Sequence, residues 1–341
     1  METLSQLSNN AVYSATIVFT FALLAHVAEW AMARQLPTAE EELGSRALVG
    51  AGAREMDGDA PGAPAGPTTG STETGATAVA GEDDEVERSD RFGRIGLSLT
   101  VLGVVLLAVG VLCRGLAADR VPWGNMYEFT TTCSLAVSLA YLFLVRRYQI
   151  RWLGPFVTGF LTLVLGIAVL VFYEPLTPLV PALHSYWLMI HVSAAAVAGG
   201  AYTVGMLASV LFLVRRRMEA KAARSPQAPR TGFLWRTPSA ESIDRVAYRV
   251  HAFAFPLWTF AVLCGAIWAQ YAWGRFWGWD PKEVWAFITW VAYAAYLHAR
   301  ATAGWQGKAA AYVALLGYAT FIFNFVGINL FGSGLHSYAG M

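Results

Sequence analysis

The sequence is dominated by apolar blocks that are long enough to cross a lipid bilayer. Of its 341 residues, 56% are hydrophobic and only 14% are charged, whereas a soluble domain carries about 25% charged residues. A run of about 20 apolar residues is read as a membrane helix. We therefore predict an all-α, polytopic membrane protein with about eight transmembrane helices. They fall at roughly residues 11–33, 92–113, 127–145, 152–173, 186–214, 247–270, 283–299 and 309–331.

The basic residues give these helices an orientation. If the N-terminus lies outside, 20 of the 24 arginines and lysines fall on the inner side, and only Arg114, Arg120, Arg275 and Lys282 fall on the outer side. The positive-inside rule favours this arrangement. We therefore expect a multi-pass protein of a bacterial plasma membrane with both termini outside. The loop at about 270–283 then lies on the outer face.

The chain divides into three predicted parts. Residues 1–34 hold a first transmembrane helix, because they lack the short apolar region and cleavage site of a signal peptide. Residues 35–90 hold 13 of the 23 acidic residues, three arginines and no aromatic residue. This composition cannot bury enough surface to offset the cost of ordering, so it predicts a disordered, acidic cytoplasmic linker. Residues 91–341 form a seven-helix membrane domain, in which we place the function.

The cysteines exclude two kinds of protein. Cys113, Cys133 and Cys264 lie far apart, and the chain contains neither a C-x-x-C pair nor a C-x-x-C-H site. It is therefore neither a thiol oxidoreductase of the usual kind nor itself a c-type cytochrome.

The most distinctive stretch is WGRFWGWDPKEVWAFITW, which places five tryptophans in eighteen residues at 273–290. Within it, Asp280 followed by proline and, three residues on, Glu283 has the spacing of a helix capping box. Tryptophans also gather at membrane interfaces, around the lipid-facing rim. Trp277 and Trp279, however, lie in the loop itself, and Trp123 adds an indole from another outer loop.

Three histidines separate into two depths. His191 lies near the outer start of the fifth predicted helix and His336 lies in the outer tail, so both can reach the tryptophan loop. His298 lies 17 residues after Pro281, which is about 26 Å at 1.5 Å per residue. It therefore belongs near the inner side. A lone histidine on a helix is more often a packing residue than a ligand, but ionisable groups in membranes are costly and by default indicate function.

An aromatic recess flanked by two histidines suits a large planar ligand with a central metal. Haem has these properties, since indoles stack on the macrocycle and imidazoles serve as axial ligands. The residues of this outer recess are His191, His336, Trp277, Trp279 and Trp123.

The string WGWDPKEVWAFITWVAYAAYLHAR resembles the tryptophan-rich WWD motif of the CcsA family, also called ResC, of System II cytochrome c biogenesis. Counterparts follow in order in WGNMYEF at 123–129, SYWLMIHV at 185–192 and GLHSY at 334–338. The resemblance covers most of the chain from about residue 95 onward.

This resemblance implies a haem-transporting protein that acts with a CcsB/ResB-type partner. The pair would pass haem b to the outer face and present it to C-x-x-C-H sites of apocytochrome c for thioether formation. His191 and His336 would be the axial ligands of the outer haem. The haem would bind against the motif residues Trp277, Trp279, Asp280 and Trp285, with Trp123 from the neighbouring loop. His298 would be one ligand of an intramembrane haem, with the other ligand supplied by the partner. The chain would then be a subunit of a lyase-class complex, with no catalytic acid, base or thiol of its own and no nucleic-acid partner.

Other readings stay open at this point. A membrane b-type cytochrome in electron transfer would hold haem between facing helices inside the bundle. A haem-handling protein of another assembly system would share the tryptophan motif. A solute transporter would show inverted repeats or broken helices near the midplane, and we find neither in the sequence. His26, at a depth similar to that of His298, is a further candidate ligand of an inner haem.

Overall fold

The computed structural model describes residues 2–33, 73–148, 150–178, 183–225, 233–302 and 305–336. This part of the chain is helical and contains no strand, which confirms the all-α prediction. The α-helices are α1 (Glu2–Ala33), α3 (Glu73–Ala118), α4 (Met126–Tyr148), α5 (Gly154–Leu170), α6 (Tyr186–Arg224), α7 (Phe233–Arg236), α8 (Ala240–Trp273), α9 (Pro281–Thr302), α10 (Lys308–Ile322) and α11 (Ile328–Phe331). A 3₁₀ turn, Arg151–Leu153, precedes α5, and a π-helical turn, Phe323–Gly327, joins α10 to α11.

The predicted membrane spans all fall on helices. Seven helical segments of the described chain are long and apolar enough to cross a membrane. The eighth predicted span, 283–299, lies on α9, whose 22 residues have the required length and carry charged residues at both ends. The molecule is therefore a multi-span helical membrane protein.

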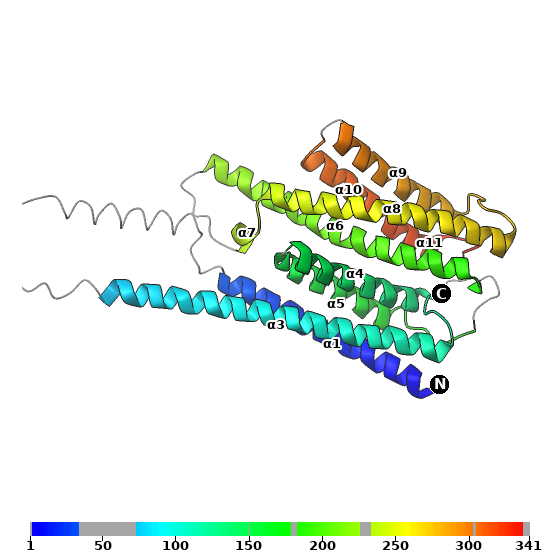
Figure 1. Ribbon diagram of the computed structural model, residues 1–341, viewed down its shortest axis with the longest axis horizontal. Coiled ribbons are helices and arrows are strands. Elements are labelled where there is room, and N and C mark those ends of the chain that lie inside the picture. Colours follow the sequence, from blue (N-terminus) through cyan, green and yellow to red (C-terminus); the bar gives the residue numbers. More distant parts are fainter. Residues whose placement is uncertain are drawn as a thin grey trace, which may run out of the picture.

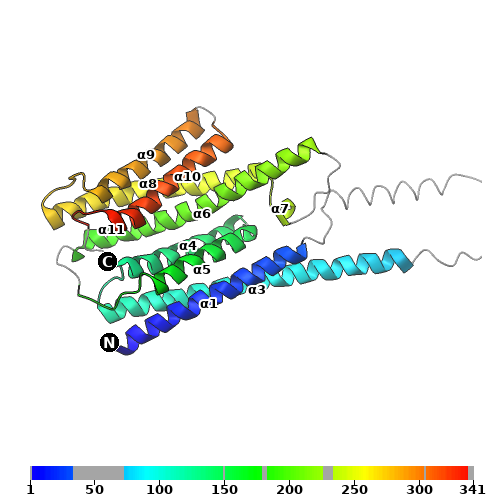
Figure 2. The same cartoon turned by 180° about the vertical axis from the view of Figure 1, so that it is seen from behind.

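The helices pack in pairs that lie side by side along the bundle (Figures 1 and 2). α1 pairs with α3 at one side, α4 and α5 follow, α6 and α8 come next, and α9 and α10 lie at the opposite side. The start of α1, the end of α8, the start of α9 and α11 all lie at one end of the bundle (Figure 1). We call this the cavity end.

The α1–α3 pair extends further than the sequence indicates. Residues 73–90, which we expected to be disordered, form the first turns of α3, while residues 34–72 lie outside the described part. Ordering is favoured here because Asp90 accepts a hydrogen bond from Arg151 at 2.6 Å, and Ser89 donates one to the carbonyl of Glu29 at 3.3 Å. Three glycines of α3 at seven-residue spacing let α1 approach closely. They are Gly96, Gly103 and Gly110, which face His26, Phe19 and Val12.

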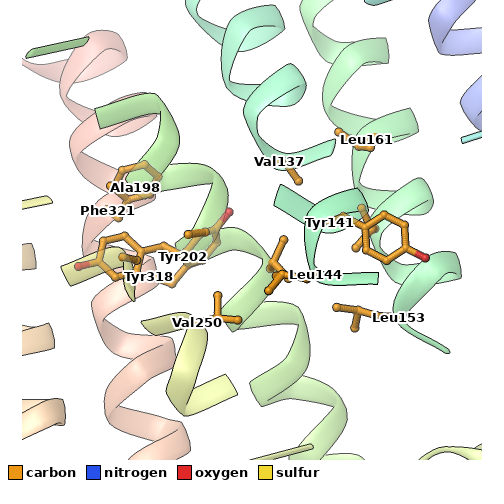
Figure 3. Close-up of a cluster of buried hydrophobic side chains, with 14 of the residues drawn as sticks. Val137, Tyr141, Leu144, Leu153, Leu161, Ala198, Tyr202, Val250, Tyr318 and Phe321 are labelled. Carbon is orange, nitrogen blue, oxygen red and sulfur yellow. The ribbon is translucent and has the colours of Figure 1, made fainter. Parts of the chain in front are cut away.

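The core between the central pairs is closed by large aromatic side chains (Figure 3). Tyr202 of α6 stacks on Tyr293 of α9, with ring centroids 3.8 Å apart and planes 9° apart. Trp258 of α8 and Phe321 of α10 pack edge to face at 5.5 Å. Both of these last residues also border the cavity described below. Aromatic packing thus closes the bundle on the inner side of that cavity.

Candidate functional site

A large cavity opens at the cavity end of the bundle. The space between its walls, counted together with its open mouth, is about 1260 Å³. α4, α6, α8, α9 and α10 contribute to its walls, and the chain after α11 closes one side. Its lining is largely apolar and aromatic, as in Trp123, Phe129, Trp258, Trp268, Trp277 and Phe325.

His191 enters the cavity from the first turns of α6. Ser185 caps this helix by accepting a hydrogen bond from the backbone N–H of Trp187 at 3.2 Å. The Nδ1 of His191 lies 2.7 Å from the carbonyl oxygen of Ala261 in α8. A carbonyl can only accept, so Nδ1 carries the proton and Nε2 carries the lone pair. Gly265 makes room for the ring, because a Cβ there would lie 2.8 Å from its Cε1.

His336 enters the cavity from the chain after α11 and is held by Asp280. Its Nδ1 donates to Oδ2 of Asp280 at 2.7 Å, and the backbone N–H of Leu335 donates to Oδ1 at 2.8 Å. Metal-binding histidines commonly donate their second ring N–H to a carboxylate in this way, which orients the ring and selects the tautomer. Asp280 therefore connects the start of α9 to the C-terminal segment.

The local charges favour an ionised aspartate beside a neutral histidine. Burial alone would raise the pKa of Asp280, but hydrogen bonds from His336 and from the backbone of Leu335 hold it below its usual value. Burial lowers the pKa of His336 in spite of the opposing effect of the Asp280 carboxylate. Neutral imidazole is the form of histidine that binds metals.

The loop before α9 is folded by the predicted capping box. Oε2 of Glu283 accepts hydrogen bonds from the backbone N–H of Asp280 at 3.1 Å and of Gly278 at 2.8 Å. Arg275 adds an ion pair with Glu283 at 3.0 Å. α8 ends at Gly274 with a φ of 70°, which glycine adopts without strain. These contacts direct Trp277 into the cavity.

Only some of the tryptophans that we expected at the site line the cavity. Trp123 and Trp277 line the cavity. Trp279 is 65% exposed, and Trp285 packs on Phe323 with centroids 4.3 Å apart. Neither of these last two residues lines the cavity.

Sequence reasoning missed Trp268 of α8, which lies beside both histidines. Its ring is nearly parallel to that of His191, with centroids 6.2 Å apart and planes 10° apart. It meets the ring of His336 at 5.7 Å and an angle of 63°. Trp268 lies within a predicted membrane span and before the tryptophan-rich stretch. Its spacing of three residues from Gly265, which places both on one helix face, was the available signal.

The other histidines lie outside this cavity. His298 is exposed on α9, about 26 Å along the helix from Pro281 by its rise of 1.5 Å per residue. His26 is fully buried, with Nδ1 3.2 Å from Glu29. Its ring is packed so tightly against Gly96 and Gly154 that a Cβ on either glycine would overlap it. The ring of His26 is thus packed between α1, α3 and α5.

Comparison with known proteins decides the family. Residues 123–336 match the family described as Cytochrome C assembly protein. The chain is 34% identical over 287 residues to the cytochrome c biogenesis protein CcsA of Porphyra purpurea, covering 74% of this chain and 89% of that one. It is 36% identical over 276 residues to the CcsA of Synechococcus sp. strain CC9902, with the same shares covered. The chain belongs to the CcsA family.

Two further findings concern the extent of the family match in this CcsA-family chain and its fold. The family match begins at Trp123 and ends at His336, and both of these residues line the cavity. The fold is similar to a solved structure of the cytochrome c haem lyase CcmF, with a TM-score of 0.57 and 16% identity. That similarity covers 96% of this chain but only 50% of the CcmF chain, so this protein spans about half of that structure. A haem-handling role in cytochrome c biogenesis follows from the family.

Proposed function

We propose that this protein binds haem b as its substrate in the cavity and presents it for attachment to apocytochrome c. His191 and His336 would supply the two axial ligands through Nε2. The observation that supports this proposal is that the two imidazoles are held in the same way. Each enters the same cavity, and each has Nδ1 held by an acceptor, a carbonyl at 2.7 Å for His191 and a carboxylate at 2.7 Å for His336.

The lining of the cavity suits a porphyrin chemically. Its walls are apolar and aromatic, and Trp268 packs beside both histidines. An apolar shell around the iron limits access of water and tunes its redox potential. When bound, the haem supplies the iron and the vinyl groups on which thioethers form. The protein's contribution is to hold and orient that substrate.

Release requires that one axial histidine be replaced by an incoming ligand. The histidine of a C-x-x-C-H site has the right chemistry, and it would bring the two thiols to the same haem. Of the two protein ligands, His336 is the better candidate for displacement, because it lies in the segment after α11, whereas His191 is part of the long helix α6.

A second haem site would be shared with another protein. His298 is exposed on the outside of α9, so its imidazole is accessible to a neighbouring subunit. We propose that a CcsB/ResB-type partner packs there and supplies the opposite ligand. The path then runs from this inner site to the outer cavity of a bacterial plasma membrane, where the WWD loop, at about 270–283, faces outward.

A b-type cytochrome that only transfers electrons is the second candidate. Such a protein holds haem between facing helices inside its bundle. Here the cavity is at the end of the bundle, and one histidine comes from the segment after the last helix. An open site of this kind favours delivery of the haem over its retention.

The test is co-expression of the chain with its partner and a C-x-x-C-H reporter. His191→Ala, His298→Ala and His336→Ala are each scored for bound haem and for covalent reporter maturation. We expect each variant to lose maturation, with the outer haem lost only in the His191 and His336 variants. A purified complex with no Soret band, or with a band unchanged after both outer histidines are removed, excludes the proposed function.

A further inference from the structure

One side of the cavity contains polar groups that the described residues leave without partners. The indole Nε1 of Trp123 and the amide Nδ2 of Asn125 are buried donors with no hydrogen-bond acceptor in the described part of the chain. Both residues line the cavity. A buried donor without a partner loses its hydrogen bonds to water and gains none in return, which destabilises the folded state. Two of them in one short loop therefore indicate that a ligand supplies the acceptor.

The orientation of the Asn125 amide is set by its own helix. Its Oδ1 accepts a hydrogen bond from the backbone N–H of Glu128 at 2.8 Å, as expected of a residue that caps α4. The oxygen is therefore used by the helix, and the NH₂ group remains as the donor. The Asn125 side chain is 4% exposed, so it is a buried polar group and not a surface one.

The loop that carries both donors is held in place by one buried carboxylate. Glu128 is fully buried and accepts hydrogen bonds from the backbone of Gly124 at 2.8 Å, from Arg120 at 2.6 Å and from Arg114 at 3.0 Å. The two arginines come from the end of α3 and the loop after it. They hold this loop through Glu128, and neither arginine is among the residues that line the cavity.

We propose that Trp123 and Asn125 form a carboxylate subsite that binds a propionate group of the haem. This inference rests on the proposed function and deepens it. Lys282 also lines the cavity and adds a cation, whereas the lining carboxylate of Glu283 is already paired with Arg275. The vinyl groups of haem b lie on the edge opposite the propionates. Trp123 and Asn125 therefore set the rotation of the porphyrin about its axial ligands, and with it the direction in which the vinyl groups point.

Two variants remove the donors and keep the local structure. Asn125→Asp retains an oxygen to cap α4 but replaces the donor with a negative charge. Trp123→Phe retains an aromatic ring and removes the N–H. The probes are haem and haem dimethyl ester, in which both propionates are esterified, titrated into the full chain with its partner after haem removal. The axial ligation of each complex is read from its Soret and α/β bands.

We expect the wild-type protein to bind haem at least tenfold more tightly than the ester, as for hydrogen bonds to a charged group. Asn125→Asp should remove this preference, chiefly by weakening haem, and Trp123→Phe should reduce it. The bis-histidine spectrum should persist in both variants. Equal affinities of wild type for the two probes, or an unchanged preference in both variants, would overturn the subsite. Failure of wild type to bind either probe would instead contradict the proposed function, and with it this inference.

Discussion

The histidines at the cavity end and those at the opposite end of the bundle have different surroundings. At the cavity end, His191 and His336 face one cavity, and each ring is oriented by a second residue, Ala261 or Asp280. At the opposite end, His298 is exposed and His26 is enclosed by its own helices. Under the proposed function, the first arrangement would supply both axial ligands from one chain. The second would supply one imidazole and need a ligand from another chain.

The strongest test of this difference removes each histidine in turn from the chain expressed without its partner. We expect His191→Ala and His336→Ala to lower haem affinity by more than a hundredfold, because each loses an axial bond to iron. His298→Ala should leave the haem affinity of the isolated chain within about twofold of wild type. Haem titration followed at the Soret band measures all three. A large effect of His298→Ala without the partner would show that the two ends are not independent.

Asp280→Asn should produce the next largest effect. The amide keeps the size of the side chain but loses the charge that orients His336, and loss of such a supporting group lowers metal affinity by about 10–100-fold. Haem affinity should fall by that amount while His191 still binds the iron. Because the sixth ligand, His336, is then labile, the absorption spectrum should show mixed-spin haem. Unchanged affinity and spectrum would show that the carboxylate serves only to cap α9.

Gly265→Ala should disturb His191 without removing it. The added Cβ would lie 2.8 Å from the imidazole, so the ring must move away from the carbonyl of Ala261. We expect a loss of about tenfold in haem affinity, equivalent to about 1.4 kcal/mol. Gly166→Ala is the matched control, since a Cβ there meets nothing within 4 Å. If both variants bind haem as wild type does, the close approach of α8 does not position the ligand.

We expect the smallest effects on haem affinity from substitutions of two tryptophans, Trp268 and Trp279. Trp268→Leu should weaken haem binding several-fold, because its ring packs beside both axial histidines. Trp279→Leu should change haem affinity little, since that side chain is 65% exposed and does not line the cavity. The same titration measures both. The reverse order would mean that the WWD loop rearranges around its substrate.

Several features of the site could be predicted because they depend on local sequence. In the capping box at Asp280, the Glu283 half requires only residues three apart and forms as expected. The Asp280 carboxylate binds Leu335 and His336, which are distant in sequence. The depth of His298 follows from the rise of a helix. The tryptophan-rich stretch identifies the outer loop, but two of its indoles, Trp279 and Trp285, do not reach the cavity. Their direction depends on a backbone of positive φ at Trp279 and on the packing of Trp285 against Phe323.

The sequence alone determined the class of protein and the approximate positions of its membrane-spanning helices, and it singled out His191 and His336, because hydropathy and helical rise are properties of the chain itself. Tertiary structure decided which groups meet. Trp268 joins the two histidines, Asp280 binds His336, and Glu128 fixes the loop of Trp123 only because helices distant in sequence pack at one end of the bundle. Contacts between such helices depend on side-chain packing in three dimensions, and no short-range pattern encodes them.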